Sequence, residues 1–205
     1  TRKSDRRLRS TSRLFPLINS ALAQAKTDAD KTRILLLRAK LRCFGFGTAR
    51  LHFRVNSRHV TNGIRSVFGI NSEHTVDKRT LARRMAKKIA SEKPASVNFA
   101  SLALEKNTAH RQMILIAQIH KYIDNETPIR MLIAECEDSI IPLGMLYLAR
   151  HYRLEKHIDI SPLFETASAL NNAGRIMDKL LGYDIYKDYV RERGVFAVQT
   201  GFSDA

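Results

Sequence analysis

Three short apolar runs in the second half of the chain constrain the fold more than any other feature. They read IRMLIAE (129–135), IDISPLFE (158–165) and VFAVQTGFSD (195–204). The segments between them carry apolar residues at helical spacing, with Pro142 in the first turn of one predicted helix and Thr166 or Ser168 as the cap of the next. Strands that alternate with helices and start about 30 to 40 residues apart are typical of parallel βα units. Near-continuous apolar strands further indicate a parallel sheet that is covered on both faces.

The first half of the chain adds helices and one further strand. Residues 14–25 and 28–41 carry helical spacing, and so do residues 76–91 and 108–123. Between these pairs, TARLHFRV (48–55) alternates apolar and polar side chains, which indicates a strand. We therefore expect a helix-rich α/β fold with about four parallel strands, in which a helical segment (1–42) precedes a sheet-bearing region (43–205).

Composition limits the compartment and the partners. No apolar run approaches the ~18 residues that a membrane span requires. Two cysteines, Cys43 and Cys136, are too few for a disulfide framework and suit a reducing compartment. We expect a cytoplasmic protein with no membrane partner.

The net charge of +15 lies entirely in the first hundred residues, and residues 101–205 are close to neutral. Such an excess is compatible with a nucleic-acid-binding or scaffold module. However, the most basic segment, RTLARRMAKK (79–88), lacks interleaved aromatic residues and a helix-turn-helix pattern. A solvated helix face is therefore the favoured interpretation, and the basic module remains an alternative.

Charged side chains follow the predicted strands at the point where each strand ends: Arg54, Glu135, Glu165 and Asp204. In parallel βα folds the carboxyl ends of the strands meet at one edge, where functional residues collect. Two carboxylates from neighbouring strand ends, Glu165 and Asp204, would suit a hard divalent cation such as Mg²⁺. Arg54 could clamp a phosphate or carboxylate through its planar set of donors.

Each of these residues also has a simpler explanation. Glu165 could complement the positive end of the following helix, and Asp204 could be a helix N-cap. Glu135 belongs to the acidic cluster ECED and could cap the next helix. Arg54 could be a structural ion-pair partner. Spacing alone leaves these alternatives open.

Three stretches of the sequence resemble the phosphoenolpyruvate carboxylase family. SPLFETASALNNA (161–173) is similar to the family segment whose Glu binds the divalent metal, and QTGFSDA (199–205) is similar to the GYSDS loop whose Asp is the second metal ligand. RCFGFGTARLHFRVNSRH (42–59) is similar to the segment whose strand-end Arg binds the substrate phosphate. The resemblance runs from about Leu36 to Ala205, although the chain reads RVNS where the family usually reads RQES, and Phe202 replaces a Tyr.

The resemblance implies an enzyme that carboxylates phosphoenolpyruvate with bicarbonate to give oxaloacetate and phosphate. It implies that Glu165 and Asp204 hold Mg²⁺ or Mn²⁺, that Arg54 is catalytic, and that Arg54 and Arg58 bind the substrate. It also implies a homotetramer and a (β/α)8 TIM-type barrel. Such a barrel needs roughly 250 residues, so we expect a partial barrel, a piece of a longer enzyme, with little turnover on its own. Another Mg²⁺-dependent barrel enzyme acting on a phosphorylated enol or keto acid is the alternative.

Overall fold

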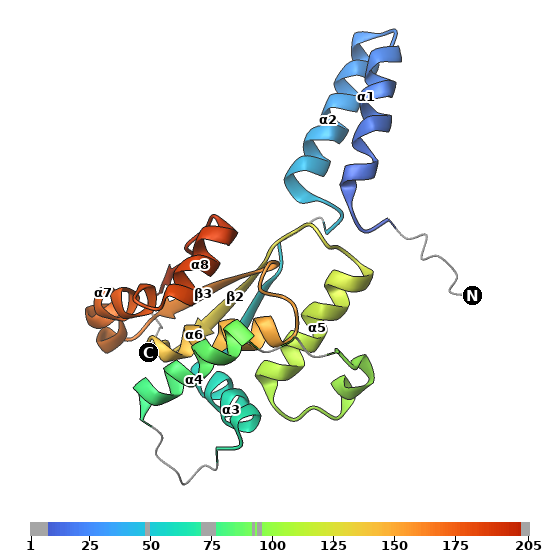
Figure 1. Cartoon of the computed structure of the whole chain (residues 1–205). Coiled ribbons are helices and arrows are strands. Elements are labelled where there is room, and N and C mark those ends of the chain that lie inside the picture. Colours follow the sequence, from blue (N-terminus) through green and yellow to red (C-terminus); the bar gives the residue numbers. More distant parts are fainter. Residues whose placement is uncertain (1–7, 48–49, 71–76, 92, 94–95, 202–205) are drawn as a thin grey trace. The chain divides into compact units, whose positions relative to one another are not determined.

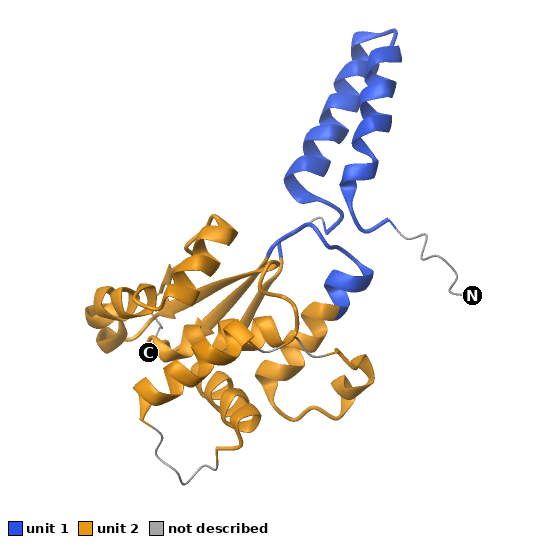
Figure 2. Cartoon of the chain, viewed as in Figure 1, with its two compact units in different colours: residues 1–50, 118–128 blue, residues 51–117, 129–205 orange. Residues whose placement is uncertain are grey.

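The computed structural model describes residues 8–47, 50–70, 77–91, 93 and 96–201, and the chain divides into two compact units. Unit 1 comprises residues 1–50 and 118–128, and unit 2 comprises residues 51–117 and 129–205 (Figure 2). All described strands belong to unit 2. The division predicted between residues 42 and 43 stays a prediction.

Unit 1 is built around two helices. Its described elements before residue 50 are η1 (Thr11–Arg13), α1 (Phe15–Gln24) and α2 (Asp28–Phe44). Thr27 caps α2, because its hydroxyl accepts a hydrogen bond from the Asp30 N–H at 3.1 Å. Gly45 ends the helix at a φ of 58°, a conformation that glycine adopts without a Cβ penalty. The two helices predicted near the N-terminus are confirmed.

The sheet of unit 2 contains four described strands in the order β1-β2-β3-β4, and all neighbouring pairs are parallel. The strands are β1 (His52–Asn56), β2 (Ile129–Ala134), β3 (Ile158–Phe164) and β4 (Gln199–Thr200). Strands β2 and β3 are almost entirely buried, which explains their near-continuous apolar sequence. The predicted helix-rich α/β fold with four parallel strands is confirmed, and it is compatible with part of a (β/α)8 barrel.

Helices connect and cover these strands (Figure 1). They are α3 (Ser57–Phe68), α4 (Lys78–Ser91), the 3-10 helix η2 (Phe99–Ala103), α5 (Thr108–Tyr122), α6 (Ile140–His151), α7 (Ala167–Leu181) and α8 (Asp184–Arg193). Helix α6 packs against α3 and α4. The approach to α3 is close, since a Cβ at Gly144 would overlap the side chain of Ile64. Among the described helices, none is both long enough and apolar enough to cross a bilayer.

Two features of unit 2 differ from the expectations. The sequence analysis predicted no helix over residues 57–68, where the structure has α3. The apolar run Val195–Val198 was expected to be a strand, but the described strand is only Gln199–Thr200. That expectation is wrong because β4 can pair with β3 only at Leu163 and Phe164. The edge of β3 before these residues is already occupied by a side chain of α8.

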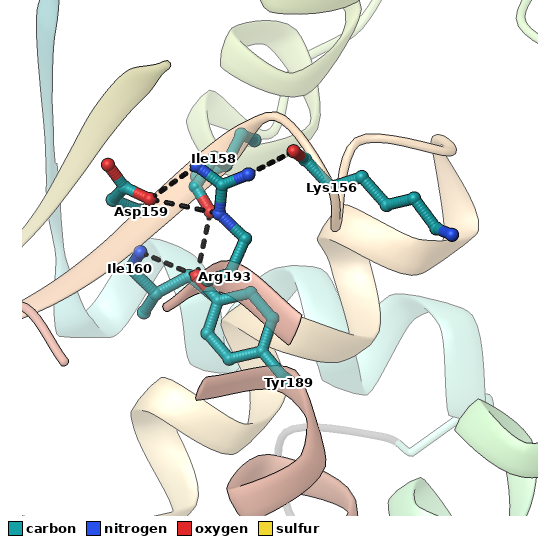
Figure 3. Close-up of polar contacts among 6 residues, drawn as sticks. All are labelled: Lys156, Ile158, Asp159, Ile160, Tyr189 and Arg193. Carbon is teal, nitrogen blue, oxygen red and sulfur yellow. Dashed lines mark hydrogen bonds and ion pairs between the residues drawn. The ribbon is translucent and has the colours of Figure 1, made fainter. Parts of the chain in front are cut away.

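That side chain is Tyr189, which fastens α8 to the edge of β3 (Figure 3). Its hydroxyl accepts a hydrogen bond from the Ile160 N–H at 2.9 Å and donates one to the Ile158 carbonyl at 2.7 Å. Four residues later, Arg193 forms an ion pair with Asp159 at 2.7 Å and also donates to the Lys156 carbonyl. Tyr189 thereby takes the place of a neighbouring strand for the backbone of β3 at Ile158 and Ile160.

Candidate functional site

The carboxyl edge of the sheet brings together two of the predicted site residues, Arg54 and Glu165. Arg54 lies in β1, and Glu165 follows the last residue of β3. The Nη2 atom of Arg54 lies 2.9 Å from Oε2 and 3.2 Å from Oε1 of Glu165. The Glu165 side chain is 10% exposed, whereas that of Arg54 is 60% exposed. A nearly buried carboxylate is thus held by a guanidinium that remains open to solvent.

The loop between β2 and α6 supplies a second donor to the same carboxylate. Glu135 has a φ of 55°, and its backbone N–H donates to Oε1 of Glu165 at 3.0 Å. Positive φ is uncommon for a residue with a Cβ, and such residues are often found at functional sites. The sequence analysis considered the carboxylate of Glu135, whereas the structure uses its amide at the site.

Thr166, the residue after Glu165, caps helix α7. Its hydroxyl oxygen accepts a hydrogen bond from the Ala169 N–H at 3.0 Å, and its hydroxyl donates to Oε1 of Glu137 at 3.1 Å. The first turn of α7 contains no acidic residue. The capping position is therefore filled by Thr166, and the described contacts of Glu165 are with Arg54 and Glu135 instead.

Gln112 is a site residue that the sequence analysis missed. It lies on α5, and its side-chain Nε2 donates to the backbone carbonyl of Arg54 at 2.8 Å. Its Oε1 is buried and has no hydrogen-bond partner among the described residues. Gln112 thus fixes the backbone of β1 at Arg54 from a helix more than fifty residues away. No local pattern in the sequence could have indicated this contact.

Arg58, another predicted site residue, is not part of this contact network. Arg58 is exposed in the first turn of α3, where its N–H donates to Oδ1 of Asn56 at 2.9 Å. Asp204 lies outside the described residues. The Gly201 N–H donates to the carbonyl of Phe164 at 3.1 Å, so the chain still runs beside β3 three residues before Asp204. The roles of Arg58 and Asp204 stay predictions.

The carboxylate oxygens of Glu165 at this edge are ligands of the type that a hard cation prefers. An ionised carboxylate has about four lone-pair positions, so the contacts with Arg54 and Glu135 leave Glu165 able to bind a metal as well. Mg²⁺ commonly uses one or two protein carboxylates and takes its other ligands from water and substrate. No group of three or more metal-binding side chains occurs in the described part of the chain. Glu165 therefore fits as one ligand of a site that uses few protein ligands.

The neighbouring cysteine does not contribute a nucleophile. Cys136 is fully buried, and burial raises the pKa of its thiol to about 12. It packs with Phe164, Ala169 and Ile176 beneath the loop. Cys136 is therefore a core residue and not a candidate nucleophile.

The chain is similar to known proteins along most of its length. The family model described as phosphoenolpyruvate carboxylase matches residues 6–205. Phosphoenolpyruvate carboxylases of Azorhizobium caulinodans, Rhodopseudomonas palustris and Bradyrhizobium diazoefficiens are 25%, 26% and 27% identical over 199, 199 and 190 residues. The matches cover 92%, 92% and 84% of this chain, but 21%, 22% and 20% of the relatives. The chain thus spans about a fifth of the length of these relatives. It belongs to the phosphoenolpyruvate carboxylase family.

Proposed function

We propose that the chain forms part of the active site of an enzyme that carboxylates phosphoenolpyruvate with bicarbonate, giving oxaloacetate and phosphate. The observation that carries the proposal is the contact between Arg54 and Glu165 at the carboxyl edge of a parallel sheet. The family match adds the reaction class. The activity is proposed for the whole protein, a cytoplasmic homotetramer, and not for these 205 residues alone.

Arg54 would bind and orient the phosphate of the substrate. Both of its contacts with Glu165 use Nη2, and no described residue pairs with its Nε or Nη1. The N–H groups of Nη1 and Nε therefore remain as charged donors for the oxygens of a phosphate. The ion pair with Glu165 and the hydrogen bond from Gln112 to the Arg54 carbonyl would limit the freedom of the guanidinium. Arg58, in the first turn of α3, would add positive charge near the substrate.

Glu165 and Asp204 would hold the divalent cation, Mg²⁺ or Mn²⁺. When bound, the cation would supply Lewis-acid stabilisation of negative charge on the substrate. The amide of Glu135 would keep the carboxylate of Glu165 in place, as outer hydrogen bonds to metal ligands generally do. Glu165 would also place its own negative charge between the cation and Arg54, so that the two positive groups can approach one substrate.

Replacing Glu165 by glutamine is expected to weaken Mn²⁺ binding to the chain by at least about tenfold, because a neutral amide is a poorer ligand for a hard cation. Asp204→Asn should have a similar effect. Titration of the purified chain with Mn²⁺, followed by electron paramagnetic resonance of the free ion, measures both. Glu137→Gln is the matched control, because Glu137 lies in the adjacent loop and contacts Thr166 instead. Equal weakening by all three variants would contradict the assignment.

Replacing Arg54 by glutamine is expected to weaken the Mn²⁺-dependent binding of 2-phosphoglycolate, a substrate analogue, by about tenfold or more. The reason is the loss of a charge-assisted hydrogen bond to phosphate. Isothermal titration calorimetry of the chain in the presence of Mn²⁺ measures the change. Arg83→Gln, which removes an exposed charge from α4, is the control and should leave the affinity unchanged. Binding that needs no Mn²⁺ and falls equally in both variants would refute the proposed role.

A further inference from the structure

The first half of helix α5 carries three polar side chains that are each hydrogen-bonded to a backbone carbonyl of the segment formed by β1 and α3. The pairs are Gln112 Nε2 with Arg54 at 2.8 Å, Asn107 Nδ2 with His59 at 3.3 Å, and His110 Nε2 with Gly63 at 3.3 Å. The three carbonyls follow one another along the end of β1 and the first two turns of α3. One helix thus holds this whole segment by its backbone.

The carbonyl of Arg54 lies on the edge of β1 that faces away from β2. The Leu51 carbonyl accepts the Arg130 N–H of β2 at 3.1 Å. Because the residues of a strand in a parallel sheet bond alternately to either side, the Arg54 carbonyl points to the opposite edge. Among the described strands, none pairs with β1 on that edge. Gln112 therefore supplies the donor on that side, at the residue whose guanidinium contacts Glu165.

His110 joins α3 to the residue that follows α6. It is 7% exposed, and its Nδ1 lies 2.8 Å from the hydroxyl oxygen of Tyr152. The Gly63 carbonyl can only accept, so Nε2 carries the imidazole proton and Nδ1 accepts from Tyr152. Burial, with a smaller contribution from the charge of Glu105, raises the pKa of Tyr152 to about 12, so its hydroxyl keeps the proton that it donates. His110 is thereby fixed from two sides.

Asn107 uses both halves of its side-chain amide. Its Oδ1 accepts the His110 N–H at 3.1 Å and caps the start of α5, while its Nδ2 donates to α3. Helix α3 comes close at this point, since a Cβ at Gly63 would lie 3.3 Å from Oδ1 of Asn107 and 3.4 Å from Nε2 of His110. The glycine therefore permits the approach through which both side chains reach the backbone of α3.

We propose that Asn107, His110 and Gln112 are positioning residues, which hold β1 and α3 so that the guanidinium of Arg54 meets the substrate phosphate in a fixed orientation. This inference rests on the proposed function, because it assigns the three residues to the binding of the same substrate. Their hydrogen bonds go to backbone carbonyls, so they fix the course of the segment that also carries Arg58. A displacement of about 1 Å in such a segment is enough to impair a site strongly.

The test compares two binding measurements on the chain. Isothermal titration calorimetry measures 2-phosphoglycolate binding in the presence of Mn²⁺, and electron paramagnetic resonance measures Mn²⁺ binding alone. Gln112→Leu, His110→Phe and Asn107→Ser should each weaken analogue binding by about fivefold, the equivalent of one hydrogen bond. Mn²⁺ binding should stay unchanged, because its proposed ligands come from other strands. Leu115→Ala, at an exposed position of α5, is the control and should change neither affinity.

Two substitutions separate positioning from capping and from packing. Asn107→Ser keeps a capping oxygen at the start of α5 but removes the donor to His59. His110→Gln keeps a donor for the Gly63 carbonyl, so it should recover most of the affinity that His110→Phe loses.

A double-variant cycle decides whether these residues act through Arg54. Gln112→Leu should cost much less analogue affinity in an Arg54→Gln background than in the original chain, because no guanidinium is left to position. The ¹⁵N relaxation of Nε of Arg54 gives the same answer without a ligand. This group should become more mobile in Gln112→Leu and His110→Phe, but not in Leu115→Ala.

Three results would overturn the inference. One is an equal loss from Gln112→Leu in both backgrounds, which would mean that α5 stabilises the fold without acting through Arg54. A second is a parallel loss of Mn²⁺ and analogue binding, which would indicate a general loosening of the chain. A third is unchanged mobility of Nε of Arg54 in every variant. If Arg54→Gln itself leaves analogue binding unchanged, the proposed function fails, and the relaxation measurement still decides whether α5 positions Arg54.

Discussion

Replacing Arg193 by methionine is expected to lower the free energy of unfolding by about 3–5 kcal/mol, because it leaves a buried carboxylate without its counter-charge. The side chains of Arg193 and Asp159 are only 14% and 11% exposed. Nε and Nη2 of Arg193 lie 3.0 and 2.7 Å from Oδ1 of Asp159 (Figure 3). The guanidinium also donates to the Lys156 carbonyl. Methionine keeps much of the apolar packing of the side chain and removes all of these donors.

Urea unfolding followed by circular dichroism measures the loss. The control is Glu192→Gln, one residue earlier on α8, which breaks an ion pair with Lys156. Both members of that pair are more than half exposed, so the variant should change stability far less. The double variant Asp159→Asn with Arg193→Met should lose less than the single Arg193 variant, because the orphaned charge is gone. A loss below about 1 kcal/mol for Arg193→Met would show that the pair is effectively solvated.

The parallel sheet could be predicted from sequence because its signal is local. Strands β2 and β3 are apolar along almost their whole length, and helical spacing separates them. Helix α3 carries a mixed signal: Val60, Ile64 and Phe68 recur at helical spacing, but its sequence, SRHVTNGIRSVF, also contains a glycine and several β-branched residues of low helix propensity. Its stability comes from burying Val60 and Ile64, the latter against α6 at Gly144. Tertiary packing of this kind overrides local propensity.

The contacts of the candidate site also include some that the sequence could predict and others that it could not. The meeting of Arg54 with Glu165 follows from a general rule, because parallel strands bring their carboxyl ends to one edge. The hydrogen bond from Gln112 and the positive φ of Glu135 depend on the packing of distant segments and on a loop conformation. The short extent of β4 likewise depends on Tyr189, which occupies the edge of β3 from another helix. The spacing of residues along the sequence does not indicate such contacts.

The last prediction concerns the support beneath the site. Replacing Phe164 by alanine is expected to lower the free energy of unfolding by about 3–5 kcal/mol, since it removes a buried ring and leaves a cavity. Phe164 is fully buried in a cluster with Cys136, Ala169 and Ile176. Its backbone carbonyl also accepts the Gly201 N–H, so it joins β3 to the segment after β4. Urea unfolding measures the change.

Because Phe164 directly precedes Glu165, this substitution also tests whether the core positions the site. Phe164→Leu fills part of the cavity and should cost much less stability than alanine, which keeps the experiment informative if the alanine variant does not fold. Leu104→Ala, at a side chain that is 82% exposed, is the matched control and should stay within about 0.5 kcal/mol. If the leucine variant is folded but binds Mn²⁺ more weakly, the buried ring helps to hold the carboxylate in place. Unchanged stability in Phe164→Ala would contradict the packing described for this cluster, because a ring of that size cannot leave a close-packed core without cost.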